Sequence, residues 1–152
     1  MALRPILKEP TKFLRQPSAL FPVEEIGTKE TEALMVDMIE TMYDANGIGL
    51  AGPQIGIGKQ IIVVLMDDAK PRVFFNPELV TPSLRKVDSE EGCLSVPGIY
   101  GKVKRHRTVK VKALDENGKP VTISASGLTA IIFQHEIDHL NGTLFIDKRI
   151  PV

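Results

Sequence analysis

The residues best suited to chemistry in this chain are two histidines four positions apart. Residues 135–139 read His-Glu-Ile-Asp-His, an H-E-x-x-H pattern in a segment whose spacing predicts a helix. Four residues turn a helix by about 400°, so His135 and His139 lie on nearly the same face. Two imidazoles so placed can bind one metal ion, and Glu136 lies beside them, where its carboxylate can reach a metal-bound water. The pattern indicates a hydrolytic metal site; the alternative is two ordinary helical histidines.

Two histidines leave a catalytic metal site incomplete. Such a site takes three protein ligands and keeps one position open for water. No further Glu or His follows closely after His139, so the third ligand has to come from upstream. Cys93, the single cysteine of the sequence, is the candidate. The alternatives for a lone cysteine in a reducing compartment are buried filler and a nucleophile.

The segment that carries the histidines also has an apolar stripe. Leu128, Ile131, Ile132, His135 and His139 recur at helical spacing. We expect this stripe to face the core, which would bury both histidines among aliphatic side chains. An unpartnered buried imidazole costs free energy, and a shared metal ion would satisfy both rings.

Two helices are predicted to position these residues among short strands. Thr28 begins a helix that should end near Asp44, and Ser126 begins a second one that should end near His139. Residues 1–27 and the glycine-rich stretch 47–58 are expected to be irregular. Strands are expected at 61–66, at 73–75 and at several places between 84 and 124, with a turn at 116–119.

This element pattern indicates an α+β fold. Short, mostly antiparallel strands should pack around a central helix that carries the H-E-x-x-H pattern. The 152 residues suit one domain, spanning residues 1–152.

Composition excludes several classes of function. The chain has 19 basic and 19 acidic residues, so net charge makes no case for nucleic-acid or membrane binding. No apolar run approaches the roughly 20 residues of a membrane span. Residues 1–10 lack the apolar stretch of a signal peptide, which favours a cytoplasmic location. Residues 47–52 match G-x-G-x-x-G, but they follow a predicted helix rather than a strand, which argues against a dinucleotide site.

Three segments together resemble the motifs of the peptide deformylase family. Residues 47–54 resemble its first motif, residues 91–95 its middle motif and residues 134–140 its last, in the family's order and roughly its spacing. The resemblance is to bacterial-type members, and it implies the deformylase fold. It also implies a metal hydrolase that removes the N-formyl group from the N-terminal methionine of new polypeptides and releases formate.

The resemblance assigns a role to each site residue. Glu136 should take a proton from the water and later pass one to the departing amine. The side chain of Gln54 and the backbone N–H of Leu94 should stabilise the oxyanion. The metal ligands should be Cys93, His135 and His139.

The resemblance also implies how the substrate is held. The peptide backbone should pair with the edge around Ile48, Gly49 and Gly92. Glu91 and Arg105 should form a buried ion pair that shapes the site without reacting. The methionine side chain should occupy an apolar pocket near Leu128, Ile131 and Ile132.

By the same resemblance, the native metal should be Fe²⁺, with Zn²⁺, Ni²⁺ or Co²⁺ as substitutes. The partners should be N-formylmethionyl nascent peptides and, as a further candidate, the ribosome. The sequence departs from the family at Gly52, where alanine is usual, and at Tyr100, where many bacterial members have arginine. Gly52 should loosen Gln54, and Tyr100 should alter the pocket rim. The C-terminus at Pro151-Val152 is short, as in phage-encoded members, so the expected location is a bacterial cytosol or that of a phage host.

Three other functions remain open from the sequence. One is a metallopeptidase that cuts internal peptide bonds, although such enzymes do not usually use a cysteine ligand. Another is a non-catalytic protein that keeps the metal site and binds nascent chains or the ribosome. The third is a thiol hydrolase built on Cys93.

Overall fold

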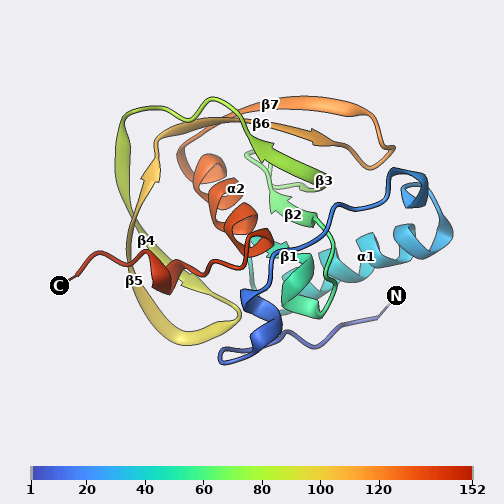
Figure 1. The fold of residues 1–152 in the computed structure, drawn as a ribbon, viewed down its shortest axis with the longest axis horizontal. Helices are drawn as coiled ribbons and strands as arrows, with labels where there is room; N and C mark the ends of the chain where they lie inside the picture. The colour runs from blue at the N-terminus through green and yellow to red at the C-terminus, as the bar shows by residue number, and fades with distance from the viewer. Residues whose placement is uncertain (1, 152) are drawn as a thin grey trace.

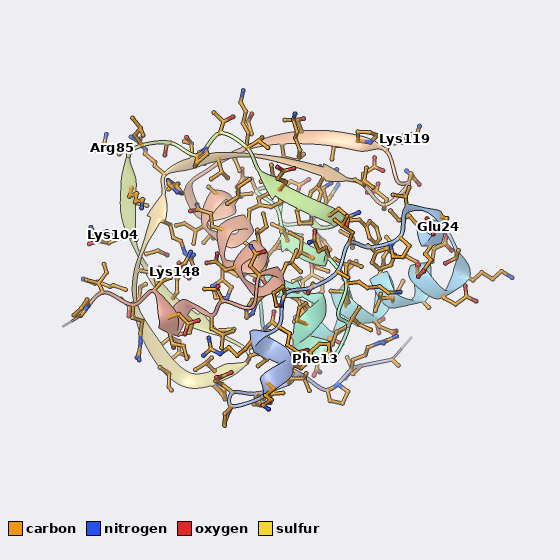
Figure 2. The ribbon with its side chains drawn as sticks, viewed as in Figure 1. Phe13, Glu24, Arg85, Lys104, Lys119 and Lys148 are labelled. Carbon is orange, nitrogen blue, oxygen red and sulfur yellow. The ribbon has the colours of Figure 1, made fainter. Side chains whose placement is uncertain are left out.

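Strands surround a central helix, α2 (Gly127–Leu140), in this computed structural model, which describes residues 2–151 (Figure 1). A second helix, α1 (Lys29–Asp44), lies to one side. Charged side chains such as Glu24, Lys104 and Lys119 project outward around this frame (Figure 2). The strands are β1 (Gly49–Ala51), β2 (Ile61–Leu65), β3 (Pro71–Leu79), β4 (Lys86–Cys93), β5 (Val96–His106), β6 (Thr108–Leu114) and β7 (Pro120–Ser126).

The strands form two antiparallel sheets. The larger has the order β1-β2-β3-β6-β7, so β1 is one of its edge strands. The smaller is the hairpin β4-β5. Along β6, Val109 and Val111 are buried whereas Lys110 and Lys112 are exposed, because successive side chains of a strand point to opposite faces. The α+β class and the antiparallel pairing predicted from the sequence are confirmed.

Helix α2 is held by packing against the larger sheet. Ala130, Phe133, Ile137 and Leu140 are buried in a cluster with strand residues. The ring centroid of Phe133 lies 5.3 Å from that of Phe74 on β3, a tilted aromatic contact. This contact and the surrounding aliphatic side chains fix how the helix, and therefore both histidines, sit against the sheet.

Helix α1 begins and ends where the sequence predicts. The side chain of Thr28 accepts a hydrogen bond from the N–H of Thr31 and caps the first turn. Met38 and Met42 are fully buried in a second cluster, which also contains Leu50 of β1. Ser126 occupies the N-cap position of α2, but its side chain makes no capping hydrogen bond.

Several segments predicted as irregular contain regular structure. Within residues 1–27 there are two short 3-10 helices, Lys12–Arg15 and Val23–Glu25. The glycine-rich stretch 47–58 contains β1 and a 3-10 helix at Gly52–Ile55. These pieces are too short to show a periodicity in the sequence, and they are held by neighbouring parts of the chain.

The strand predicted at residues 73–75 extends on both sides, as β3. It passes through Asn76 and Pro77, where the pairing with β6 shifts register. Asn76 has φ 52°, and its side chain accepts a hydrogen bond from the N–H of Phe21 and donates one to the Phe21 carbonyl. These two bonds stabilise the irregularity, and a proline in a strand is tolerated at such a position.

Within residues 2–151, neither helix has the length and apolar character that crossing a membrane requires.

The packing of α2 gives a stability prediction. Phe133→Ala should lower the free energy of unfolding by about 3–5 kcal/mol, because it leaves a cavity beside Phe74. Leu84→Ala, at a fully exposed position, should change it by less than about 0.5 kcal/mol. Equilibrium denaturation in urea measures both. Equal effects of the two substitutions would contradict the packing described for α2.

Candidate metal centre and active site

Three side chains converge where β4 meets α2. Cys93 Sγ lies 3.3 Å from His139 Nε2. The candidate ligand atoms of Cys93, His135 and His139 all lie within 4.8 Å of one another. In a tetrahedral centre with metal–sulfur and metal–nitrogen bonds of about 2.3 and 2.0–2.1 Å, sulfur and nitrogen lie about 3.5 Å apart. One thiol and two imidazoles at this spacing fit a divalent cation.

A buried ion pair orients the first histidine. Glu91 Oε1 lies 2.9 Å from His135 Nδ1, which leaves His135 Nε2 for a metal ion. Arg105 donates to both carboxylate oxygens of Glu91, from Nε at 2.8 Å and from Nη2 at 2.7 Å. Arg105 also donates to Asp138 on α2 at 2.6 Å. The structure therefore contains the Glu91–Arg105 pair in a buried, two-pronged form.

Burial and these hydrogen bonds shift the pKa values of the ionisable groups. Burial alone would raise the pKa of Glu91, but hydrogen bonds from Arg105 and His135 outweigh it and lower the value to about 2. Burial, together with the positive charges of His135 and Arg105, lowers the pKa of His139 well below its ordinary value. His139 is therefore neutral at physiological pH, which is the form that binds metal.

His135 differs from His139. Burial lowers its pKa, but hydrogen bonds to Cys93 and Glu91 outweigh burial and raise the value to about 10. His135 is therefore protonated on both ring nitrogens at neutral pH. A metal ion held by His135 would displace the proton on Nε2.

Glu136 lines the same cleft as Cys93 and His135. Its side chain is buried, and burial raises its pKa to about 7. A carboxyl group with this pKa can accept and release a proton near neutral pH. Glu136 Oε1 is buried and has no hydrogen-bond partner among the described residues.

Gly49 on β1 allows this arrangement. A Cβ atom at position 49 would lie 2.6 Å from Glu136 Oε2 and 2.9 Å from Ile132 Cγ2. Only glycine lets the edge strand approach α2 this closely without moving the Glu136 carboxylate.

The carboxamide of Gln54 is held at both ends. Its Oε1 accepts from the N–H of Ala51 at 2.9 Å, and its Nε2 donates to Ser95 Oγ at 3.1 Å. Nε2 also lies 3.7 Å from Cys93 Sγ, at the edge of the metal centre. The expected loosening of Gln54 by Gly52 stays a prediction. A Cβ at position 52 would lie 2.8 Å from the carbonyl oxygen of Lys59, so this backbone fits glycine closely.

The candidate metal centre opens into a cleft of about 680 Å³, which Cys93 and His135 line. Its lining residues come from the stretch around β1, here called the β1 wall, from the hairpin β4-β5, here called the hairpin wall, and from α2. Leu94, in the turn between β4 and β5, lines the cleft, as does Tyr100 on β5. The expected substrate-binding residues all line it as well: Ile48, Gly49, Gly92, Leu128, Ile131 and Ile132.

The apolar stripe of α2 does not face the core throughout, as the sequence suggested. Ile132 is buried, Ile131 is partly buried and Leu128 is 60% exposed. The stripe lines the cleft instead, since Leu128, Ile131 and Ile132 are all among its lining residues. An apolar surface along a cleft is available to a ligand rather than to the protein interior.

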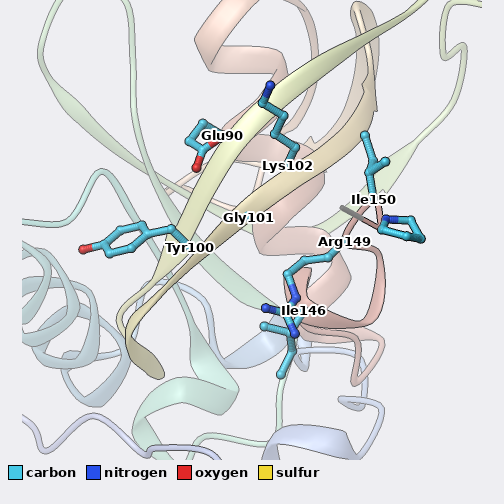
Figure 3. Close-up of a pocket in the computed structure, with 8 residues that line it drawn as sticks. Glu90, Tyr100, Gly101, Lys102, Ile146, Arg149 and Ile150 are labelled. Atoms are coloured by element: carbon cyan, nitrogen blue, oxygen red, sulfur yellow. The ribbon is translucent and has the colours of Figure 1, made fainter.

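A larger hollow, of about 790 Å³, lies beside the C-terminal segment (Figure 3). It is lined by Tyr100, Lys102 and Arg149 among others, but by none of the metal-ligand candidates and not by Glu136. Size therefore does not identify the active site here. The convergence of ionisable groups with shifted pKa values does.

Three residues of the site escaped the sequence analysis. Ser95 accepts from Gln54, Asp138 accepts from Arg105, and Lys8 Nζ donates to the carbonyl of Leu94 at 3.1 Å. Asp138 could have been suspected because it lies within the H-E-x-x-H segment. Lys8 has no local signal, because its partner is 86 positions away.

The chain is similar to known proteins over nearly its whole length. A family model described as polypeptide deformylase matches residues 3–152. A peptide deformylase of Psychrobacter cryohalolentis is 49% identical over 97% of this chain and 79% of its own. Peptide deformylase 1 of Clostridium perfringens is 47% identical over 99% of this chain and 100% of its own.

Solved structures agree with the sequence comparisons. A class I type b peptide deformylase from Acinetobacter baumannii superposes with a TM-score of 0.95 at 37% identity, covering 97% of this chain and 100% of the other. The enzyme from Thermotoga maritima gives a TM-score of 0.91 at 33% identity, covering 99% and 100%. Together with the family match, these similarities show that the chain belongs to the peptide deformylase family, metal-dependent enzymes that remove the N-formyl group from newly made polypeptides.

Proposed function

We propose that Cys93, His135 and His139 hold the metal ion with which this chain hydrolyses the formyl amide of N-formylmethionyl peptides. The observation that carries the assignment is the convergence of these three donors, within 4.8 Å of one another, beside a buried carboxyl group in one cleft. We also propose that residues 1–152 act as one catalytic domain, because the site draws on segments from Lys8 to His139.

Glu136 is the proton carrier of the proposed reaction. When bound, a divalent cation supplies Lewis acidity, which makes a water acidic enough to act as a nucleophile near pH 7. Glu136 accepts the proton of that water and then donates it to the departing amine. Its pKa of about 7 suits both transfers.

Gln54 and Leu94 stabilise the negative charge that develops on the formyl oxygen. The Gln54 amide is already oriented by Ala51 and Ser95, so little reorganisation is needed during the reaction. The N–H of Leu94 is the second donor, in the turn directly after the cysteine ligand.

The peptide backbone adds to the edge of β1. Edge strands carry unpaired backbone groups, and the wall opposite β1 contributes Gly92. The methionine side chain occupies the apolar part of the cleft along Leu128, Ile131 and Ile132. One similar structure, a deformylase from A. baumannii, has the peptide Met-Ala-Ser bound, which supports a methionine-first ligand.

The donor set, one sulfur and two nitrogens, suits iron or zinc. We propose Fe²⁺ as the native metal, with Zn²⁺, Ni²⁺ and Co²⁺ as substitutes, and metal analysis after anaerobic purification tests this. Formylated N-termini first appear on nascent chains at the ribosome. We therefore propose the cytosol, close to ribosomes, as the place of action.

Formate release from a formyl-Met peptide tests the function. We expect release with the purified protein, loss of release after chelation, and recovery when a divalent metal is added back. The same peptide without its formyl group should stay intact. Cleavage of internal bonds in the unformylated peptide would instead favour a metallopeptidase. Formate release that survives chelation and is lost on alkylation of Cys93 would favour a thiol hydrolase.

The proton-carrier role predicts the effect of one isosteric change. Glu136→Gln should lower kcat about 10²- to 10⁴-fold, because the amide cannot accept the proton. Metal content should stay at the wild-type level, since Glu136 is not a ligand. Glu32→Gln, at an exposed position on α1, is the matched control and should keep wild-type kcat. Steady-state kinetics with metal analysis would contradict the role if Glu136→Gln stayed within a few-fold of wild type.

The buried ion pair predicts a difference between two cations of the same strand. Arg105→Met should lower the free energy of unfolding by about 3–5 kcal/mol, because Glu91 and Asp138 lose their buried partner. Lys104→Met removes only an exposed pair with Asp88 and should cost less than about 1 kcal/mol. Urea denaturation compares the two, and equal costs would show that the Arg105 network is dispensable.

A further inference from the structure

The N-terminal segment spans the two walls of the cleft. The N–H of Leu7 donates to the carbonyl of Gln54 at 2.7 Å, and the N–H of Glu9 donates to the carbonyl of Ser95 at 2.8 Å. Gln54 belongs to the β1 wall, and Ser95 belongs to the turn of the β4-β5 hairpin. Residues 7–9, here called the strap, therefore connect the β1 wall to the hairpin wall.

The strap places a cation against the turn that follows Cys93, and Lys8 is among the residues that line the cleft. Lys8 Nζ donates to the carbonyl oxygen of Leu94 at 3.1 Å. Lys8 is exposed, and it forms no salt bridge among the described residues. Its ammonium group binds a backbone carbonyl instead of a carboxylate. The backbone bonds of Leu7 and Glu9 on either side restrict where the Lys8 side chain can reach.

The carbonyl that Lys8 contacts belongs to the peptide unit that reaches the cysteine. The Leu94 carbonyl and the Ser95 N–H form one peptide group, and this N–H donates to Cys93 Sγ at 3.4 Å. A cation at the oxygen end of a peptide group polarises it and strengthens donation by its N–H, as in any chain of hydrogen bonds. The line of contacts runs from the ammonium of Lys8, through one peptide group, to the sulfur.

We propose that Lys8 is a positioning residue that tunes the cysteine ligand: its ammonium, held by the strap, strengthens the hydrogen bond from the Ser95 N–H to the Cys93 sulfur. This inference rests on the proposed role of Cys93 as a metal ligand. Hydrogen bonds to a thiolate reduce the charge that it donates to a metal ion. Lys8 therefore keeps the thiolate from quenching the Lewis acidity on which the reaction depends.

Three variants of the full-length protein test the proposal. Lys8→Met removes the cation and Lys8→Arg keeps it. Lys12→Met removes an exposed cation of the same region, whose side chain makes no hydrogen bond or salt bridge with the described residues. Each protein is loaded with Co²⁺, and the thiolate-to-cobalt charge-transfer band is recorded. The kcat and KM for a formyl-Met peptide are measured in parallel.

Lys8→Met should move the charge-transfer band to longer wavelength, because a thiolate with a weaker hydrogen bond gives up charge more easily. It should also lower kcat three- to ten-fold while KM stays within two-fold. Lys8→Arg should restore both values, and Lys12→Met should leave both at wild type. Hydrogen exchange at the Ser95 amide should be faster in Lys8→Met than in wild type.

A wild-type band position and kcat in Lys8→Met would overturn the proposal, as would an equal shift in Lys12→Met. If Lys8→Met folds poorly, Lys8→Gln gives the same test, since a neutral donor should produce a smaller shift in the same direction. If the wild-type protein releases no formate but Lys8→Met still shifts the band, the proposed function is refuted and the role of Lys8 stands. A wild-type Co²⁺ protein with no thiolate band would refute both.

Discussion

A single buried carboxylate, Glu91, holds the functional part of this molecule together. It lies between the guanidinium of Arg105 and the imidazole of His135, and it stays ionised because those two partners outweigh the cost of burial. Arg105 also binds Asp138, so the hairpin β4-β5 is joined to α2 by charge at the point where Cys93 meets the histidines. Removing one partner of a buried ion pair is strongly destabilising, because the other charge is left buried and unpaired. The ion pairs of Arg105 therefore favour the observed position of the hairpin against the helix.

Burial also affects Glu136, which lies beside this network on α2. Removing Glu136 from solvent raises its pKa to about 7, so its carboxyl group can both take and return a proton. Gly49 lets an edge strand approach that carboxyl, and Gln54 is held by the backbone of Ala51 and the hydroxyl of Ser95. These groups are therefore held by contacts within the protein, and β1 is left as an open edge of its sheet.

The two walls of the cleft belong to different sheets, and no strand pairing joins them in the part of the chain that the structure describes. Their separation depends on α2 beneath them and on the strap that crosses between Gln54 and Ser95. A segment far from the motifs thus takes part in positioning the turn that follows Cys93. This explains how a site assembled from short, separate pieces can be stiff, since each piece is fixed by hydrogen bonds to at least one other.

The sequence by itself determined the features that depend on neighbours along the chain. Helical spacing indicated that His135 and His139 share a face, and capping and stop signals set both ends of α1. The tertiary structure alone decided what depends on distant partners. The Asn76 bulge is stabilised by Phe21, the α2 stripe follows a cleft rather than the core, and Lys8 reaches Leu94. The periodicity of a sequence shows which side chains share one face of a helix or strand. Which segment packs against that face depends on contacts between parts of the chain that are far apart in the sequence.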